Sequence, residues 1–288
     1  MELPRIVAIG SGVILELPEI CSKLHLEGRA LIITGPRTQD VMGKAIFKLL
    51  EDGGYEPMTL ICSASKLEEV DRAESLAREN GAGFLIGAGG GRSIDIAKLA
   101  SLGVDVPFLS VPTAASHDGI CSSQASLTVN GETTSIKAQS PLAIVADSKI
   151  ISQAPARLLA AGCGDIISNY TAILDWQLAH RLRNEEYSEY ASALAGMTAS
   201  MIVELAADIR PGLEESARIV IKALISSGVA MSIAGSSRPA SGSEHKFAHA
   251  MNKIAPGRAL HGELCGLGTI MMMYLHGGDW KMIKRALT

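Results

Sequence analysis

The chain has 288 residues, of which 47% are hydrophobic and 19% charged, so it can bury a sizeable core, and its length favours two domains. A net charge of −4, without a run of five like charges, argues against nucleic-acid binding and leaves a small molecule as the expected partner. Five widely spaced cysteines without a C-x-x-C pair indicate reduced thiols in a cytoplasmic protein, not a disulfide framework or a cysteine metal site.

Membrane insertion and export are not expected. The N-terminal residues lack a basic stretch followed by an apolar one, which a secretory signal would show. The most apolar late run, residues 267–275, is too short to span a bilayer. We therefore expect a cytoplasmic protein without a membrane anchor.

The first half of the chain alternates short β-type runs with helical patterns. Apolar side chains at helical spacing predict helices over residues 39–51 and 67–80. Crossovers of this length predict a Rossmann-like, doubly wound parallel sheet, whose ligands bind beyond the carboxyl ends of the strands. The runs predicted as strands are residues 6–9, 30–34, 57–62, 84–87 and 108–111.

The character of the chain changes near residue 149. Residues 125–130 and 133–138 predict a hairpin with its turn at 131–132, and residues 143–147 a further strand. We therefore expect a nucleotide-binding α/β domain over residues 1–149 and an all-helical metal- and substrate-binding domain over residues 150–288, with the active cleft between them. The predicted helices are residues 155–161, 166–183, 187–208 and 214–234, one carrying His245 and one after His261.

A glycine cluster follows the predicted strand at residues 84–87 and precedes a helix. Glycines let the backbone approach a phosphate, and the N-terminus of the following helix suits its charge. In the usual dinucleotide motif a third glycine stands where this chain has Arg92, after Gly87 and Gly89. The pattern alone therefore allows either a nucleotide-binding loop or a plain strand-to-helix turn.

A second loop, residues 110–119, follows the next predicted strand and is rich in hydroxyl groups. Such loops often hold ligand contacts in α/β proteins, because the carboxyl ends of parallel strands share one edge. A solvated turn capped by Asp118 explains the same residues. Both interpretations remain open from the residues alone.

Three histidines suggest a metal site. On a helix His245 and His249 lie one turn apart, about 6 Å along the axis, and His261 opens the next segment. Neutral imidazole commonly ligates zinc or iron, and a two-histidine site needs a further ligand, usually a carboxylate. Asp165, expected at the start of a helix after two glycines, is the candidate. On the residues alone, core histidines and a helix N-cap remain the alternative.

Five motifs occur in a fixed order along the chain. They are Gly89-Gly-Gly-Arg-Ser-Ile-Asp95-x-Ala-Lys98, Pro112-Thr-Ala-Ala-Ser-His-Asp118, Gly162-x-Gly-Asp165, Gly242-Ser-Glu-His245-x-x-x-His249-Ala and His261-Gly-Glu263. Together they resemble the metal-dependent superfamily of glycerol dehydrogenase, iron-type alcohol dehydrogenases and dehydroquinate synthase, and the resemblance extends over most of the chain. Within it, the second and fourth motifs are most similar to the sn-glycerol-1-phosphate dehydrogenases. The resemblance implies a dehydroquinate synthase-like fold.

The resemblance also implies roles by position. Asp165, His245 and His261 would hold one divalent metal, with zinc expected over iron, while Asp118 and His249 would face the substrate and act with Asp165 in catalysis. Glu263 is expected to support a ligand histidine. The expected contacts of NAD or NADP are Gly89, Gly90, Gly91, Arg92, Ser93, Ile94, Asp95, Thr113, Ala114, Ala115, Ser116 and Ser122.

The activity that the resemblance implies is NAD(P)H-dependent, metal-assisted reduction of dihydroxyacetone phosphate to sn-glycerol 1-phosphate, the backbone of archaeal membrane lipids. We expect a cytoplasmic homo-oligomer. The alternatives are a glycerol dehydrogenase, a dehydroquinate-synthase-like enzyme that uses NAD transiently, and a catalytically silent metal- or nucleotide-binding protein. The last is motivated by the end of the chain at Thr288, where relatives continue with further helices.

Nucleotide choice depends on the residues after the second predicted strand. An acid there would bond the ribose 2′-hydroxyl of NAD, but this chain has Arg37, a cation that could accept the 2′-phosphate of NADP. We expect the protein to tolerate both nucleotides.

Overall fold

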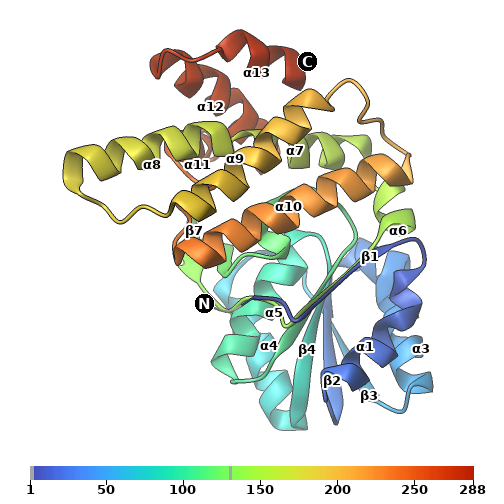
Figure 1. The fold of residues 1–288 in the computed structure, drawn as a ribbon. Helices are drawn as coiled ribbons and strands as arrows, with labels where there is room; N and C mark the ends of the chain where they lie inside the picture. Colours follow the sequence, from blue (N-terminus) through green and yellow to red (C-terminus); the bar gives the residue numbers. More distant parts are fainter. Residues whose placement is uncertain (1–2, 130–131) are drawn as a thin grey trace. The chain divides into compact units, whose positions relative to one another are not determined.

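The computed structural model describes residues 3–129 and 132–288, which form two compact units (Figure 1). The described residues up to Ala114 and from Gly119 to Gln153 form the first, here called the sheet unit. Ala115–Asp118 and Ala154–Thr288 form the second, here called the helical unit. Each unit is described by itself below.

The sheet unit is built on six parallel strands in the order β1-β8-β5-β4-β2-β3. The predicted parallel, doubly wound sheet is therefore confirmed. A separate antiparallel pair, β6 (Gln124–Val129) and β7 (Glu132–Lys137), is the predicted hairpin, while residue 131 of its predicted turn lies outside the described residues. The six strands are β1 (Ile6–Gly10), β2 (Arg29–Thr34), β3 (Glu56–Ile61), β4 (Ala82–Gly89), β5 (Phe108–Pro112) and β8 (Ala143–Asp147).

Helices cover both faces of this sheet, with α1 and α3 on one face and α4 and α5 on the other (Figure 1). The central strands therefore read as continuous apolar runs, and Leu31, Ile32 and Ile33 of β2 are all 0% exposed. The helices are α1 (Leu17–Lys23), α2 (Pro36–Thr38), α3 (Lys44–Asp52), α4 (Leu67–Asn80), α5 (Gly91–Gly103) and α6 (Ser148–Ser152), with single turns at Val13–Glu16, Gln39–Gly43 and Asp118–Ile120.

The helical unit contains seven helices among its described residues. The helix predicted over residues 214–234 is confirmed at both ends, because the apolar pattern stops at Gly235 in the left-handed conformation. It is long and apolar enough to cross a membrane, but 61% of its apolar window is buried within the protein. The helices are α7 (Ala156–Ile167), α8 (Asn169–Arg183), α9 (Glu189–Glu204), α10 (Glu214–Ala234), α11 (Ser243–Ile254), α12 (His261–Leu275) and α13 (Trp280–Leu287).

Asp165 does not begin a helix, contrary to the sequence prediction. Helix α7 continues through Gly162 and Gly164, so that Asp165 lies in its last turn and is not an N-cap. The prediction failed because glycine inside a helix is unfavourable by about 0.5 to 1 kcal/mol relative to alanine, which made the two glycines read as a connection.

Close packing explains both glycines: a Cβ atom on Gly162 would lie 2.2 Å from the Ala115 carbonyl oxygen, and Gly164 packs against α12. A Cβ atom on Gly164 would lie 2.3 Å from the carbonyl oxygen of Gly262, and one on Gly262 would lie 1.9 Å from the carbonyl oxygen of Ala161. The backbones of the two helices therefore meet where side chains are absent. This contact places the start of α12, which carries His261, beside Asp165.

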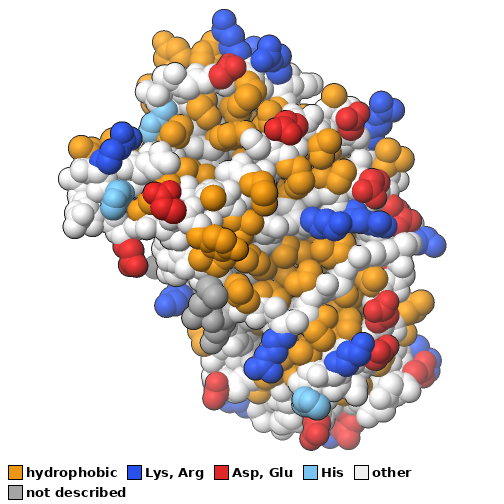
Figure 2. Space-filling view, viewed as in Figure 1, with side chains coloured by type: hydrophobic (Ala, Val, Ile, Leu, Met, Phe, Trp, Pro, Cys, Tyr) orange, Lys and Arg blue, Asp and Glu red, His pale blue; other side chains and the backbone are white. Residues whose placement is uncertain are grey.

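Large apolar side chains are exposed on α12, and the top of Figure 2 shows apolar side chains next to charged ones. Met271, Tyr274 and Leu275 are 45%, 65% and 73% exposed. Together with Ile270 and Trp280 they line a cavity of about 370 Å³. Exposed apolar patches of this kind mark contact faces.

Candidate metal centre

The three side chains named as metal ligands meet in the helical unit. Asp165 Oδ1 lies 3.9 Å from His245 Nε2 and 3.6 Å from His261 Nε2. The two imidazole rings are 4.9 Å apart between centroids. Each side chain comes from a different helix, α7, α11 or α12. The fold thus gathers one carboxylate oxygen and two imidazole nitrogens from distant parts of the chain.

Among the side chains of this site, the Asp165 carboxylate would be stabilised most by a nearby cation. Its side chain is 2% exposed, and within the described part of the chain its Oδ1 has no hydrogen-bond partner, while its Oδ2 accepts the backbone N–H of Asp118 at 2.9 Å. Burial, and then the Asp118 carboxylate, raises the pKa of Asp165, so the ionised form is unfavourable here without positive charge. A divalent cation beside Oδ1 would supply that charge, so the residues fit a metal.

Glu244 orients the His245 ring. Its side chain is 0% exposed, and its Oε1 lies 2.9 Å from His245 Nδ1 and accepts the N–H of Gly242 at 2.6 Å. Its Oε2 accepts the Thr171 hydroxyl at 2.7 Å. A carboxylate on one ring nitrogen fixes the tautomer and directs the other nitrogen at the metal. Here that nitrogen is the Nε2 that faces Asp165.

From the sequence, a supporting role of this kind is expected for Glu263 and not for Glu244. In the structure Glu263 forms a two-pronged ion pair with Arg157, with contacts of 2.5 and 2.7 Å. It also accepts the backbone N–H of Leu260 at 2.7 Å and so caps the first turn of α12. The position of Glu244 directly before His245 was the available signal, but a buried acid cannot be told from an exposed one by sequence alone.

A cysteine also reaches the ligand group. Cys265 Sγ lies 3.5 Å from His261 Nε2, and one ligand atom from each of Asp165, His245, His261 and Cys265 lies within 4.8 Å of all the others. The sequence predicts no cysteine ligand, because the cysteines form no C-x-x-C pair, whereas the structure places Cys265 beside the three expected ligands. The overlooked signal was the four-residue spacing of His261 and Cys265, which puts both on one face of a helix.

Burial and charge act differently on the two histidines of the group. Burial opposes charging of His245, but Cys265 and Glu244 beside its ring raise its pKa well above the ordinary value. Burial, and then the charge of His245, lowers the pKa of His261 well below the ordinary value. The two imidazoles are therefore not both positively charged, and a metal would displace the extra proton that the His245 ring carries when it is charged.

Asp118 and His249, named as substrate-facing residues, lie beside this group. Asp118 Oδ2 accepts a hydrogen bond from the Ser227 hydroxyl of α10 at 3.0 Å. The ring of His249 is 6.1 Å from that of His261 between centroids. Partial burial, and then the charge of His245, lowers the pKa of His249, so its ring is neutral at pH 7. A neutral imidazole can accept a proton at one nitrogen and donate one from the other.

In the sheet unit, the glycine cluster forms the start of α5 at the carboxyl end of β4. Gly89 ends the strand with a φ of 150°, and α5 begins two residues later. Among the described residues, no atom lies within 4 Å of a Cβ built on Gly90, so a ligand can approach the backbone there. The free N–H groups and positive dipole end of this 13-residue helix suit a phosphate.

The side chains named as cofactor contacts divide between buried and exposed positions. Ser93, Ile94 and Asp95 are buried in the first turns of α5, whereas Arg92 donates to the Ser63 carbonyl at 2.7 Å from an exposed position. The N–H of Thr113 donates to the Gly89 carbonyl at 3.0 Å, which holds the ends of β4 and β5 together. Ala114 and Ser122 also belong to the sheet unit, while Ala115 and Ser116 belong to the helical unit.

Asp95 has internal partners within the sheet unit. Its Oδ2 accepts the backbone N–H of Ser126 at 3.1 Å, and its Oδ1 lies 3.4 Å from the ammonium of Lys98, which is 0% exposed. Lys98 also donates to the carbonyl oxygens of Gly119 and Gln124 at 2.7 and 2.6 Å. Asp95 therefore holds the chain segment that follows β5, and a role toward a phosphate would be indirect.

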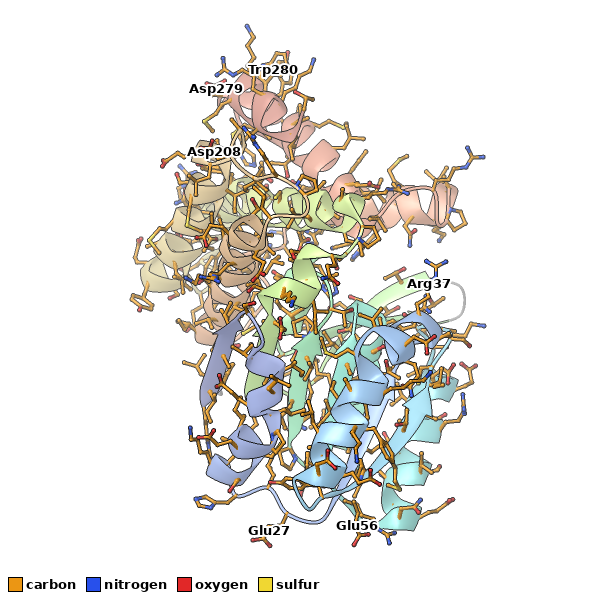
Figure 3. All side chains as sticks on the ribbon, turned by 90° about the vertical axis from the view of Figure 1, so that its right-hand side faces the viewer. Glu27, Arg37, Glu56, Asp208, Asp279 and Trp280 are labelled. Carbon is orange, nitrogen blue, oxygen red and sulfur yellow. The ribbon has the colours of Figure 1, made fainter. Side chains whose placement is uncertain are left out.

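Arg37 lies at the carboxyl end of the sheet, just after β2. Figure 3 shows it at the opposite end of the sheet unit from Glu27, which precedes β2, and Glu56, which begins β3. Its side chain is exposed. It is therefore on the edge of the sheet where nucleotides bind in this class of fold.

The chain matches known proteins over its whole length. Residues 8–155 match the model of the iron-containing alcohol dehydrogenase family. A glycerol dehydrogenase from Schizosaccharomyces pombe has the same fold, with a TM-score of 0.85 at 20% identity, over 100% of this chain and 75% of that one. A sulfoacetaldehyde reductase from Bifidobacterium kashiwanohense, solved in complex with NAD+, has a TM-score of 0.79 at 18% identity, over 99% of this chain and 84% of that one. The expected fold class is confirmed.

Sequence relatives are much closer. Glycerol-1-phosphate dehydrogenase (NAD(P)+) from Methanothrix thermoacetophila is 64% identical over 100% of this chain and 81% of its own length. The protein of the same name from Methanosarcina mazei is 61% identical with the same coverage. The chain thus belongs to the glycerol-1-phosphate dehydrogenase family within the iron-containing alcohol dehydrogenases, as the motifs predicted.

Proposed function

We propose that the chain reduces dihydroxyacetone phosphate to sn-glycerol 1-phosphate with NADH or NADPH and a divalent metal. Family membership supports the substrate, because a relative that is 64% identical carries the name glycerol-1-phosphate dehydrogenase. The observation that carries the chemistry is Asp165 Oδ1, buried without a hydrogen-bond partner among the described residues and facing two imidazole nitrogens.

Asp165, His245 and His261 would hold the metal. When bound, it would supply a Lewis acid that stabilises the negative charge developing on the carbonyl oxygen while NAD(P)H supplies hydride. The low exposure of Asp165 strengthens electrostatic interactions at this point, because little water is present to screen them. Glu244 keeps the His245 ring turned toward the same point.

Asp118 and His249 would handle the rest of the substrate. The carboxylate of Asp118, held by Ser227, accepts a hydrogen bond from a substrate hydroxyl and so orients the ketone. His249, neutral at pH 7, passes a proton through its ring to the carbonyl oxygen as that oxygen becomes a hydroxyl. One hydride and one proton thus convert the ketone to the alcohol.

The nucleotide would lie at the carboxyl edge of the sheet. The N-terminus of α5 is proposed to bind its pyrophosphate, and Arg37 to accept the 2′-phosphate when the nucleotide is NADPH. We also propose that the enzyme works in the cytoplasm as a homo-oligomer and that its product enters membrane lipid synthesis. Zinc is the proposed metal.

Substrate choice and product configuration test this function. Purified, zinc-loaded protein is assayed for NADH and NADPH oxidation with dihydroxyacetone phosphate and, separately, with dihydroxyacetone. We expect turnover of the phosphate ester and formation of the sn-glycerol 1-phosphate enantiomer in chiral analysis. Equal turnover of the two ketones would instead favour a glycerol dehydrogenase, and the opposite enantiomer would contradict the proposal.

A further inference from the structure

Cys265 lies beside the proposed metal site but is not one of its three proposed ligands. It lies on α12, one helical turn after His261, and its side chain is buried. A buried thiol alone is a common core side chain. What distinguishes Cys265 is its neighbour Asp165 Oδ1, a buried oxygen without a hydrogen-bond partner among the described residues.

Three distances among the four ligand atoms are close to those of a tetrahedron around a small cation, and all four atoms lie within 4.8 Å of one another. Zinc bonds of about 2.0 to 2.3 Å with tetrahedral angles put neighbouring ligand atoms about 3.3 to 3.8 Å apart. The distances here are 3.5 Å from Cys265 Sγ to His261 Nε2, 3.6 Å from Asp165 Oδ1 to His261 Nε2, and 3.9 Å from Asp165 Oδ1 to His245 Nε2. Small side-chain adjustments would bring all four atoms onto one ion.

Three helices fix the atoms in these positions. The glycine contact between α7 and α12 sets the distance from Asp165 to the first turn of α12. Helical spacing then places Cys265 on the same face as His261. Glu244 holds the His245 ring from behind. The four-atom arrangement therefore results from the packing of the unit.

We propose that Cys265 is a fourth protein ligand of the metal in the substrate-free protein. The inference rests on the proposed function, because it concerns the metal of that site. A thiolate favours zinc over magnesium or manganese, which prefer oxygen ligands. Cys265 therefore makes this site selective for a thiophilic cation, and the full ligand set is one carboxylate, two imidazoles and one thiolate.

X-ray absorption spectroscopy of the zinc-loaded wild-type protein tests the ligand set without a mutation. We expect one sulfur neighbour at about 2.3 Å per zinc, together with nitrogen and oxygen neighbours at about 2.0 to 2.2 Å. Replacing zinc with cobalt gives a second readout, because a thiolate ligand produces a charge-transfer absorption band in the near ultraviolet. Zinc bound by nitrogen and oxygen alone would overturn the inference and leave the proposed function intact.

Matched variants assign the sulfur. Cys265→Ser should lose the sulfur neighbour and the cobalt band, and its zinc affinity should fall relative to its magnesium affinity. Cys163→Ser makes the same change on α7, at a thiol outside the four-atom group, and should keep both signals. A sulfur signal that survives Cys265→Ser and disappears in Cys163→Ser would overturn the assignment. Failure of the wild-type protein to bind zinc would overturn the proposed function together with this inference.

Discussion

Glu244 Oε1 lies 2.9 Å from His245 Nδ1, and the Glu244 side chain is completely buried. A buried carboxylate behind a ligand imidazole holds the ring in one tautomer and makes its other nitrogen a better metal ligand. The metal centre therefore consists of the ligand residues and of the side chains that hydrogen-bond to them and fix their orientation.

Replacing Glu244 with glutamine should weaken zinc binding while preserving the fold. The amide has the shape of the carboxylate and can keep the hydrogen bonds to Gly242 and Thr171, but it lacks the negative charge behind His245. We expect zinc affinity to fall by about 10- to 100-fold, measured by competition with a chelator. Glu185→Gln, at an ion pair with Arg238 outside the ligand group, serves as the control. Equal affinities of the two variants would show that Glu244 does not act on the metal.

The close contact between α7 and α12 predicts that Gly262→Ala is destabilising. The new methyl group would lie 1.9 Å from the Ala161 carbonyl oxygen, so the helices would have to separate. We expect a loss of about 1 to 3 kcal/mol or more in the free energy of unfolding. Gly196→Ala in helix α9 is the matched control. Its methyl group would meet the Ile173 side chain at 3.5 Å, an ordinary van der Waals distance. If urea denaturation gave Gly196→Ala a lower free energy of unfolding than Gly262→Ala, the result would contradict this packing.

Acid should weaken the helical unit through Asp175. Partial burial favours the neutral acid, but hydrogen bonds from Ser243 and His276 outweigh it and hold the pKa of Asp175 below its ordinary value. A carboxyl whose pKa is lower in the folded state stabilises the fold above its unfolded pKa, and this stabilisation is lost as pH falls through the folded pKa.

Asp175→Asn tests that pH dependence. The variant should be less stable than wild type at pH 7, by about 1 to 3 kcal/mol, because the charged acceptor is gone. The difference should shrink as pH falls from about 5 toward 3, near the ordinary pKa of an aspartate. Urea midpoints measured across this range give the comparison. A difference that stays constant with pH would mean that ionised Asp175 does not contribute.

Arg37 should bias the enzyme toward NADPH. It is exposed at the carboxyl edge of the sheet, where it could meet a 2′-phosphate. Arg37→Asp should shift the ratio of kcat/KM for NADPH over NADH by about tenfold or more toward NADH, the size of one charge-assisted hydrogen bond. An unchanged ratio in the variant would remove Arg37 from nucleotide recognition.

The sequence predicted the sheet better than the metal centre. Buried parallel strands such as the one containing Leu31–Ile33 are short apolar runs between turn signals, so they can be predicted from the local sequence. The sequence patterns divided helix α7 in two, because Gly162 packs against the backbone of Ala115 and Gly164 against that of Gly262, and local patterns do not record such distant contacts. Helix α13 was missed for a simpler reason: its eight residues are too few for a convincing apolar period.

Within the site, the sequence predicted residues whose side chains commonly bind metals, but it did not predict the residues that hydrogen-bond to them. Carboxylate and imidazole suggested a metal site, and the resemblance of the ordered motifs to a metal-dependent superfamily then named Asp165, His245 and His261 as its ligands. Cys265 was not predicted as a ligand, because the cysteines form no C-x-x-C pair, although its spacing from His261 is as regular as that between the two histidines of α11. Supporting residues depend on which side chains are buried against each other, and that information appears only in the folded structure.

Metal dependence of the reaction is the most direct test of the central claim. The protein is stripped with a chelator, reloaded with zinc, and assayed for NADPH and NADH oxidation with dihydroxyacetone phosphate, beside His245→Ala and the control His180→Ala, whose ring contacts the Glu185 carbonyl away from the ligand group. We predict that activity disappears on stripping, returns with zinc in wild type and His180→Ala, and does not return in His245→Ala. Full activity of the stripped protein, or of His245→Ala, would contradict the account.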